Sequence, residues 1–254
     1  MTTSMAQCGS EYTLCGVSYT VTRICDVCGE PKELEKGGYE FYRRCKCARS
    51  RSARNMSERL RKRGLSDITL HSMRFDNDRE YNQSVCKKAR EYAAHWDEMK
   101  AENIGLLLSG GVGTGKTFYA GCIANALIDR GVYVLMTTLS KVIGAGFGDE
   151  YREALKNVEE ADLVIFDDVG AERGTEFAWE RAFDTIDTRI RSGKPMIVTT
   201  NLSPKTMSLC ENIRERRVYD RILGSCVVIP VTGQSIRLKQ HNDKADKLRK
   251  MLEG

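Results

Sequence analysis

A glycine-rich loop directly after an apolar run constrains this sequence more than any other feature. Residues 106–117 read LLLSGGVGTGKT, which contains the pattern G-x-x-x-x-G-K-[ST]. Glycines lack a Cβ, so such a loop can wrap with successive backbone N–H groups pointing at phosphate oxygens. Lys116 would reach the outer phosphates, and the Thr117 hydroxyl would complete the coordination of Mg²⁺. The residues expected to hold a nucleotide are Gly110, Gly111, Val112, Gly113, Thr114, Gly115, Lys116, Thr117 and Phe118.

The segments around the loop predict an α/β fold. Residues 104–108 are typical of a buried strand and residues 118–130 of a helix, a context that argues against a glycine-rich turn without a ligand. Alternating strands and helices predict a five-stranded parallel sheet covered on both faces. The further strands are expected at residues 132–136, 163–166, 195–201 and 226–231, and the further helices at 79–102, 138–147, 149–160, 175–192, 213–223 and 235–252, the last as a basic helix or tail.

Length and composition suit one α/β domain with a small appendage. The 254 residues are 41% hydrophobic and 30% charged, which is ordinary for a globular protein. No apolar run approaches the ~20 residues of a membrane span, and the N-terminus lacks the pattern of a signal peptide. We therefore expect a cytoplasmic protein without a membrane partner. Ten cysteines in such a protein indicate thiols and metal ligands, not a disulfide framework.

Two close cysteine pairs near the N-terminus predict a zinc site. With 16 residues between the pairs, each pair can supply two corners of a tetrahedron of thiolates. A segment with so few apolar residues would need the metal to fold. A redox-active C-x-x-C remains an alternative, as do buried free thiols with Cys8 or Cys15 as substitutes. The expected zinc ligands are Cys25, Cys28, Cys45 and Cys47.

A basic stretch follows the second cysteine pair. Residues 43–63 contain ten Lys or Arg and a single acid, Glu58. The stretch is interpreted either as a solvated, partly helical linker or as a contact with nucleic acid or an acidic partner. We expect a zinc domain over residues 1–55, a basic connector over 56–78 and an ATPase domain over 79–254.

Acidic and polar residues end two of the predicted strands. In LVIFDD, residues 163–168, Asp167 would hold Mg²⁺ through water, and Asp168 would orient or deprotonate the attacking water. In Thr199-Thr200-Asn201, Asn201 fits a sensor that contacts the γ-phosphate and the water. The alternatives are polar turns, which Asp and Asn often initiate.

Arginines follow these strands. An arginine stripe at helical spacing is formed by Arg214, Arg217 and Arg221. It is interpreted either as a solvated helix face or as the site of an arginine finger, which would contact the nucleotide of a neighbouring subunit. Arg237, near the C-terminus, would reach the γ-phosphate within its own chain.

These motifs in this order make the sequence similar to the DnaC/DnaI family of bacterial and phage helicase loaders, close to the IstB-like AAA+ ATPases. The similarity covers most residues from 25 to 240 and rests on GGVGTGKT, LVIFDDVG, IVTTN, RVYDRILG, GQSIRLK, the cysteine pairs and RFDND. It implies an AAA+ P-loop NTPase domain with a five-stranded parallel sheet, preceded by a small zinc-binding domain. Because 23 residues follow Val231, the lid of this domain is expected to be reduced.

The resemblance also implies roles for individual residues. Arg221 has the position of the family's trans-acting arginine finger, with Arg217 as the alternative in the same stripe. Arg237 has the position of the second sensor. Phe75, with Arg74 before it, resembles the segment near the adenine.

Two further features concern contact with DNA and the rate of ATP hydrolysis. The segment with Lys141 and Phe147 resembles an insertion that touches single-stranded DNA, but it is short and its GAGFG turn is unusual. Asp168 is one methylene shorter than the Glu common at that place, which favours slow hydrolysis and a switch over a motor.

The resemblance implies an ATP-dependent loader that delivers a DnaB-type helicase hexamer onto single-stranded DNA, with hydrolysis driving release. Residues 1–55 would hold the helicase, and ATPase domains would associate with one another. Two alternatives remain: an IstB-like transposase helper that remodels DNA, against which the cysteine module argues, and an ATP-binding adaptor that scarcely hydrolyses.

Overall fold

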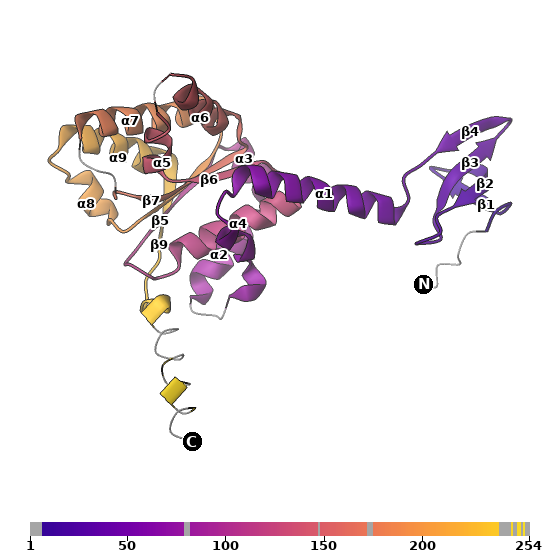
Figure 1. Cartoon of the computed structure of the whole chain (residues 1–254), viewed down its shortest axis with the longest axis horizontal. Coiled ribbons are helices and arrows are strands. Elements are labelled where there is room, and N and C mark those ends of the chain that lie inside the picture. Colours follow the sequence, from indigo (N-terminus) through magenta and orange to yellow (C-terminus); the bar gives the residue numbers. More distant parts are fainter. Residues whose placement is uncertain are drawn as a thin grey trace. The chain divides into compact units, whose positions relative to one another are not determined.

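The computed structural model describes residues 7–78, 82–146, 148–171 and 175–238, and single positions 245, 248, 249 and 251. It divides into two compact units, Met1–Glu58 and Arg59–Gly254 (Figure 1). Phe147, expected at the DNA-contacting segment, lies outside the described residues. Within the described part of the chain, no helix is both long and apolar enough to cross a membrane.

The first unit is built on an antiparallel sheet in the order β1-β2-β3-β4. Its outer hairpins are closed by the two-residue turns Cys15-Gly16 and Gly37-Gly38, with positive φ at both positions, as mirror-image hairpin turns require. From the sequence only the last strand, near residues 39–43, is predicted; the other three strands, including the eight-residue β2, are seen only in the structure. The strands are β1 Glu11–Leu14, β2 Val17–Ile24, β3 Pro31–Lys36 and β4 Tyr39–Tyr42.

Helix α1, Lys46–Gly64, begins at the second cysteine pair and continues into the second unit. The expected connector, residues 56–78, is therefore largely helical, with the short 3-10 helices η1 Ile68–Ser72 and η2 Phe75–Asn77 after α1. Three leucines of this segment belong to the hydrophobic core of the second unit: Leu60, Leu65 and Leu70.

A five-stranded parallel sheet forms the centre of the second unit, in the order β6-β7-β8-β5-β9. The expected α/β class and parallel sheet are confirmed. Strand β8 lies between β5 and β7, so the carboxyl ends of these three strands meet at one edge. The bounds are β5 Gly105–Ser109, β6 Val134–Thr137, β7 Leu163–Val169, β8 Met196–Thr200 and β9 Cys226–Pro230.

Helices cover both faces of this sheet (Figure 1). Helices α2 and α4 lie on one side, and α5, α6, α7 and α9 lie on the other. Strands β5, β7 and β8 are almost wholly buried apart from the end of β7, as the near-continuous apolar runs predict. The bounds are α2 Gln83–Ala94, α3 Trp96–Ala101, α4 Lys116–Asp129, α5 Leu139–Ile143, α6 Asp149–Glu160, α7 Glu176–Arg191, α8 Pro204–Ser208 and α9 Ile213–Ser225.

Three helices differ from the sequence prediction. The segment 79–102 forms two helices, because the backbone of His95, with ψ +29°, leaves helical geometry between α2 and α3. Beside this break the buried rings of Tyr92 and Trp96 meet edge to face, 6.3 Å apart. The helix predicted over 138–147 is the shorter α5, which ends before Gly144. Of the helix predicted over 235–252, residues 236–238 are helical, and most others lie outside the described residues.

Candidate nucleotide and metal sites

The glycine-rich loop lies between the end of β5 and the start of α4, where the sequence predicts it. Gly113 and Gly115 adopt φ +80° and +98°, which residues with a side chain rarely adopt. A Cβ on Gly110 would lie 2.0 Å from the carbonyl oxygen of Val231. The loop therefore needs glycine at these positions, and it leads into a helix N-terminus, whose free N–H groups favour an anion.

Lys116 lies at the centre of the site and is almost wholly buried. Its Nζ donates to the carbonyl oxygens of Gly110 and Gly111, at 2.9 and 2.7 Å, and to Oδ1 of Asn201 at 2.8 Å. Burial lowers the pKa of Lys116, and the carboxylates of Asp168 and Asp167 act in the opposite direction. The ammonium is thus held between the loop and the end of β8, next to the acids of β7.

Asp167 connects three elements through its carboxylate. Its Oδ1 accepts from the hydroxyl of Thr117 at 2.9 Å, and from the hydroxyl of Thr199 at 2.6 Å. A hydroxyl and a carboxylate within hydrogen-bond distance are hard oxygen donors, the kind that Mg²⁺ prefers. The donor set at Thr117 and Asp167 therefore fits the expected Mg²⁺.

Asp168 adopts φ +57°, inside an irregularity of the β7–β8 pairing between Phe166 and Val169. Its N–H donates to the Thr199 hydroxyl at 2.9 Å, and its Oδ1 accepts from Nδ2 of Asn201 at 2.9 Å. The bulge and these two bonds place the Asp168 carboxylate on the same cavity as Lys116.

A cavity of about 480 Å³ lies over the loop. Most of the site residues predicted from the sequence line this cavity. They belong to the loop, the ends of β7 and β8, and the C-terminal segment. Gly110, Gly111 and Thr114 shape the loop without lining the cavity. The predicted residues on its wall are Val112, Gly113, Gly115, Lys116, Thr117, Phe118, Asp167, Asp168, Asn201 and Arg237.

Phe75, expected near the adenine, does not line this cavity. Its ring lies under the guanidinium of Arg90, 4.7 Å from ring centre to Cζ. The neighbouring residues Met73, Asn77 and Asp78 line the cavity instead. Asn77 and Asp78 are the last two residues of RFDND, and Met73 directly precedes it, but the resemblance suggested a role only for Phe75 and Arg74 in this segment.

The segment that carries Arg237 packs directly on the loop. The N–H of Ile236 donates to the carbonyl oxygen of Gly113 at 2.8 Å. A Cβ on Gly113 would lie 2.2 Å from Oγ of Ser235, and a Cβ on Gly115 would lie 3.0 Å from Cδ1 of Ile236. Ile236 and Thr199 are therefore further site residues. They lie in the motifs GQSIRLK and IVTTN, where the sequence predicted a role only for Arg237 and Asn201.

Comparison with known proteins decides the family. The family model described as IstB-like ATP binding protein matches residues 45–244. This chain belongs to the IstB-like ATP-binding family. The matched range contains the whole nucleotide cavity but starts after the first cysteine pair, so it leaves most of the first unit outside.

Curated relatives of this IstB-like chain are named replicative helicase loader DnaC. The protein of Escherichia coli strain K12 is 29% identical over 155 residues, which cover 56% of this chain and 61% of that protein. The protein of Buchnera aphidicola subsp. Schizaphis graminum is 26% identical over 209 residues, 77% of this chain and 81% of that protein. The match to the first of these thus spans less than two thirds of its length.

Solved structures confirm the fold. A crystal structure of DnaI has a TM-score of 0.56 to this IstB-like chain at 20% identity, covering 66% of this chain and 93% of that one. At this identity the likeness shows the fold, which is the expected AAA+ P-loop architecture.

In this IstB-like chain the arginine stripe of α9 does not reach the cavity. Nη2 of Arg221 lies 3.0 Å from Oδ1 of Asp187. The guanidinium groups of Arg221 and Arg217 both lie over the ring of Phe183, at 4.5 and 4.2 Å. Arg214 pairs with Glu176 at 2.7 Å. Arg221 therefore cannot act on the nucleotide of its own chain from this position.

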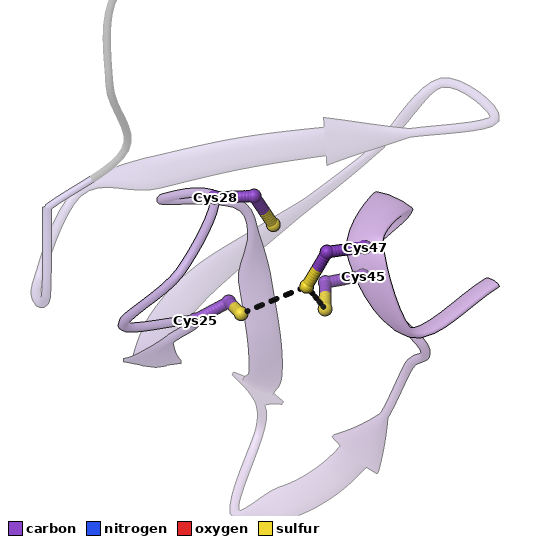
Figure 2. A group of neighbouring side chains, drawn as sticks. All are labelled: Cys25, Cys28, Cys45 and Cys47. Carbon is purple, nitrogen blue, oxygen red and sulfur yellow. Dashed lines mark hydrogen bonds between the residues drawn. The ribbon is translucent and has the colours of Figure 1, made fainter. Parts of the chain in front are cut away.

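The four predicted zinc ligands gather at one place in the first unit. Figure 2 shows the sulfur atoms of both cysteine pairs facing a common space, and all four lie within 4.8 Å of one another. The sulfur of Cys47 is 3.4 Å from that of Cys25 and 3.3 Å from that of Cys45. A tetrahedral zinc site with Zn–S bonds of about 2.3 Å needs sulfurs about 3.8 Å apart, so the cluster fits. Cys8 and Cys15 are exposed and do not belong to it.

The backbone around the first pair forms the turn expected for a metal knuckle. The N–H of Gly29 donates to the carbonyl oxygen of Cys25 at 2.8 Å, and Gly29 has φ +66°. Hydrogen bonds from the backbone N–H groups of Val27 and Cys28 lower the pKa of Cys25 to about 6. These bonds favour the thiolate of Cys25, the form that binds a metal, whereas the neighbouring thiols of Cys45 and Cys25 raise the pKa of Cys47 to about 12.

Proposed function

We propose that this chain is an ATP-dependent loader that binds a DnaB-type hexameric helicase and delivers it onto single-stranded DNA during replication initiation, with ATP hydrolysis driving release. The nucleotide chemistry rests on the meeting of Lys116, Thr117, Asp167, Asp168 and Asn201 at one edge of the sheet. The helicase partner rests on the relatives named helicase loader DnaC.

The residues of the cavity have complementary roles in this proposal. Lys116 exchanges its loop carbonyls for phosphate oxygens, and Thr117 with Asp167 holds Mg²⁺, which when bound neutralises phosphate charge. Asp168, oriented by the Asn201 amide, accepts a proton from the attacking water or aligns it. Arg237 contacts the γ-phosphate within the chain.

The remaining parts of the chain bind zinc, the helicase, neighbouring copies and DNA. A zinc ion held by the four cysteines stabilises the first unit, and residues 1–55 hold the helicase. ATPase domains associate so that Arg221 of one copy acts on a neighbour's nucleotide; the domain expected over residues 79–254 also includes the earlier segment that carries the cavity residues Met73, Asn77 and Asp78. The α5 segment with Lys141 contacts single-stranded DNA.

Native mass spectrometry with the replicative helicase hexamer from the same source, with and without ATP, tests the proposal. We expect several copies of this chain on each hexamer, and loss of the complex when Cys25 and Cys28 are both changed to Ser. No complex under any nucleotide condition would overturn the helicase assignment.

The IstB-like family also supports a second candidate, a transposase helper that remodels DNA through ATP-dependent oligomerisation. ATP-dependent assembly on duplex DNA without helicase would favour this candidate. Phosphate release distinguishes both candidates from an adaptor that scarcely hydrolyses ATP.

A further inference from the structure

The antiparallel sheet of the first unit has two faces of different chemistry. Strand register places Tyr12 opposite Tyr19, Leu34 opposite Phe41, and Lys36 opposite Tyr39. Since side chains alternate along a strand, these residues share one face, here called the aromatic face. The opposite face, here called the acidic face, carries Glu11, Glu33, Glu35, Glu40 and Tyr42.

Side-chain contacts confirm that the rings of the aromatic face lie together with cations. The rings of Tyr19 and Phe41 meet edge to face, 5.3 Å apart. Nζ of Lys36 lies 5.7 Å from the centre of the Tyr19 ring, and the guanidinium of Arg43 lies 5.0 Å from that of Tyr12. Among the described residues of the four strands, no Asp or Glu lies on this face.

Much of the aromatic face is open to solvent. Tyr39 is 73% exposed and Phe41 is 44% exposed, whereas Val21 and Leu34 beneath the rings are buried. Isolated exposed apolar residues need no explanation, but rings gathered with cations on one face and separated from four glutamates on the other indicate a binding surface.

We propose that the aromatic face binds single-stranded nucleic acid, with bases stacked on Tyr39 and Phe41 and a phosphate contacted by the exposed Lys36. Arg43 supports the face from below the surface: its side chain is 18% exposed, donates to the Tyr12 hydroxyl and pairs with Glu30 at 4.0 Å. Ring faces accept any base, and basic side chains follow a phosphate backbone, so exposed rings beside an exposed lysine fit this polymer. A protein partner could also pack against the exposed rings, and the test below distinguishes that outcome from nucleic-acid binding. The site deepens the proposed function by giving the loader a contact with DNA in its first unit, separate from the nucleotide cavity.

The test measures fluorescence anisotropy of a labelled oligothymidine of about 20 nucleotides with the full-length chain, without ATP or helicase. Tyr39 and Tyr42 form a matched pair, because they are 73% and 72% exposed on opposite faces of the same strand. We expect Tyr39→Ala to weaken binding by about 5- to 100-fold, and Tyr42→Ala to leave it unchanged. Lys36→Glu should weaken binding and flatten its salt dependence by about 0.7 in the log–log slope.

Cross-linking with a 5-iodouracil oligonucleotide locates the contact directly, and we expect cross-linked peptides that contain residues 36–43. Cross-links confined to residues 59–254, or equal effects of Tyr39→Ala and Tyr42→Ala, would overturn the inference. So would loss of helicase binding by Tyr39→Ala with unchanged DNA binding, since the face would then be a protein-docking surface. Failure of the wild-type chain to bind helicase overturns only the proposed function.

Discussion

Asp168 shows how a single residue obtains its position from the backbone. Its φ of +57° is unusual for a residue with a side chain, although Asp tolerates this region better than most. The conformation persists because the Thr199 hydroxyl accepts its N–H and the Asn201 amide donates to its carboxylate. The short side chain is therefore carried toward the cavity by the bulge of β7.

Replacing Asp168 by Asn should lower ATP turnover about 100-fold or more, because the amide cannot accept the proton of the attacking water. ATP binding, measured with a fluorescent analogue, should persist, since the loop and Lys116 remain. Asp76→Asn is a control, as this exposed carboxylate does not line the cavity. Unchanged phosphate release by Asp168→Asn would contradict the assigned role.

Arg189 is a buried cation held by carbonyl oxygens. Its guanidinium donates to the carbonyl oxygens of Val158, Ala161, Asp162 and Pro195, at distances from 2.5 to 3.2 Å. Burial lowers its pKa to about 10. The side chain thus ties the end of α6 to the segments that precede β7 and β8.

We expect Arg189→Met to lower the free energy of unfolding by about 3 kcal/mol, because it leaves buried carbonyl groups without donors. Arg191→Met removes an ion pair of an arginine that is 80% exposed, and should cost less than about 1 kcal/mol. Urea denaturation of both variants measures the difference, and equal losses would contradict this reading of Arg189.

At the scale of elements, the segment after α1 is fastened to α4 by one buried side chain. Nδ2 of Asn125 donates to the carbonyl oxygens of Leu70 and Met73, at 2.8 and 2.9 Å, and its Oδ1 accepts from Arg61 at 2.9 Å. These bonds hold Met73, and with it the wall of the nucleotide cavity, against the helix that begins at the loop.

Asn125→Ala should therefore affect both stability and nucleotide binding. We expect a loss of about 2 kcal/mol in unfolding free energy, because the buried side-chain bonds to Leu70, Met73 and Arg61 are lost, together with weaker ATP binding. Asp97→Ala removes an ion pair to Arg130 between side chains that are 86% and 40% exposed, and serves as a control for calorimetric titration with ATP. ATP affinity equal to that of the wild type would show that this wall does not depend on Asn125.

At the scale of the whole molecule, the two units depend on different interactions. The second has an extensive apolar core, whereas the buried hydrophobic residues described in the strands and cysteine turns of the first are Val21, Cys25, Leu34 and Cys45. Such a small core needs a further stabilising interaction, which the four thiolates can supply by binding a metal ion.

Metal removal should therefore unfold the first unit alone. We expect about one zinc per chain by mass spectrometry of the metal, and proteolytic cleavage within residues 1–58 after chelation, while residues 59–254 resist. Binding of ATP should remain. Freshly purified protein with well under one equivalent of zinc, or chelation without cleavage, would exclude the zinc site.

The position of Arg221 away from its own cavity predicts complementation between copies. Arg221→Ala and Lys116→Ala should each lose turnover, the first by lacking the finger and the second by lacking the phosphate contact. Mixed under conditions that assemble the protein, they should recover part of it, because a Lys116→Ala copy can supply its finger to the nucleotide of an Arg221→Ala neighbour. No recovery at any ratio would argue against a finger in trans, and Arg217→Ala tests the neighbouring arginine.

The α/β fold of the second unit is predicted from local sequence patterns, and so are most of the residues that line the candidate nucleotide site. Buried strands of parallel sheets are apolar runs in the sequence. In this chain β5 is followed by the glycine loop, and β8 by Asn201, while LVIFDD contains both β7 and its acids. The four cysteines are equally visible, because metal ligands come as close pairs. Each of these features involves residues that are close together in the sequence, so a short sequence pattern is enough to predict it.

Contacts between distant segments could not be predicted from the sequence and are known from the structure. It showed that Thr199 supports Asp167 and Asp168, that Ile236 closes on the loop, and that Met73 takes a place on the cavity wall where Phe75 was expected. It also revealed two faces of different chemistry in a sheet of which only the last strand is predicted from the sequence. Such relations arise from register and packing, which bring together residues that no spacing along the chain connects.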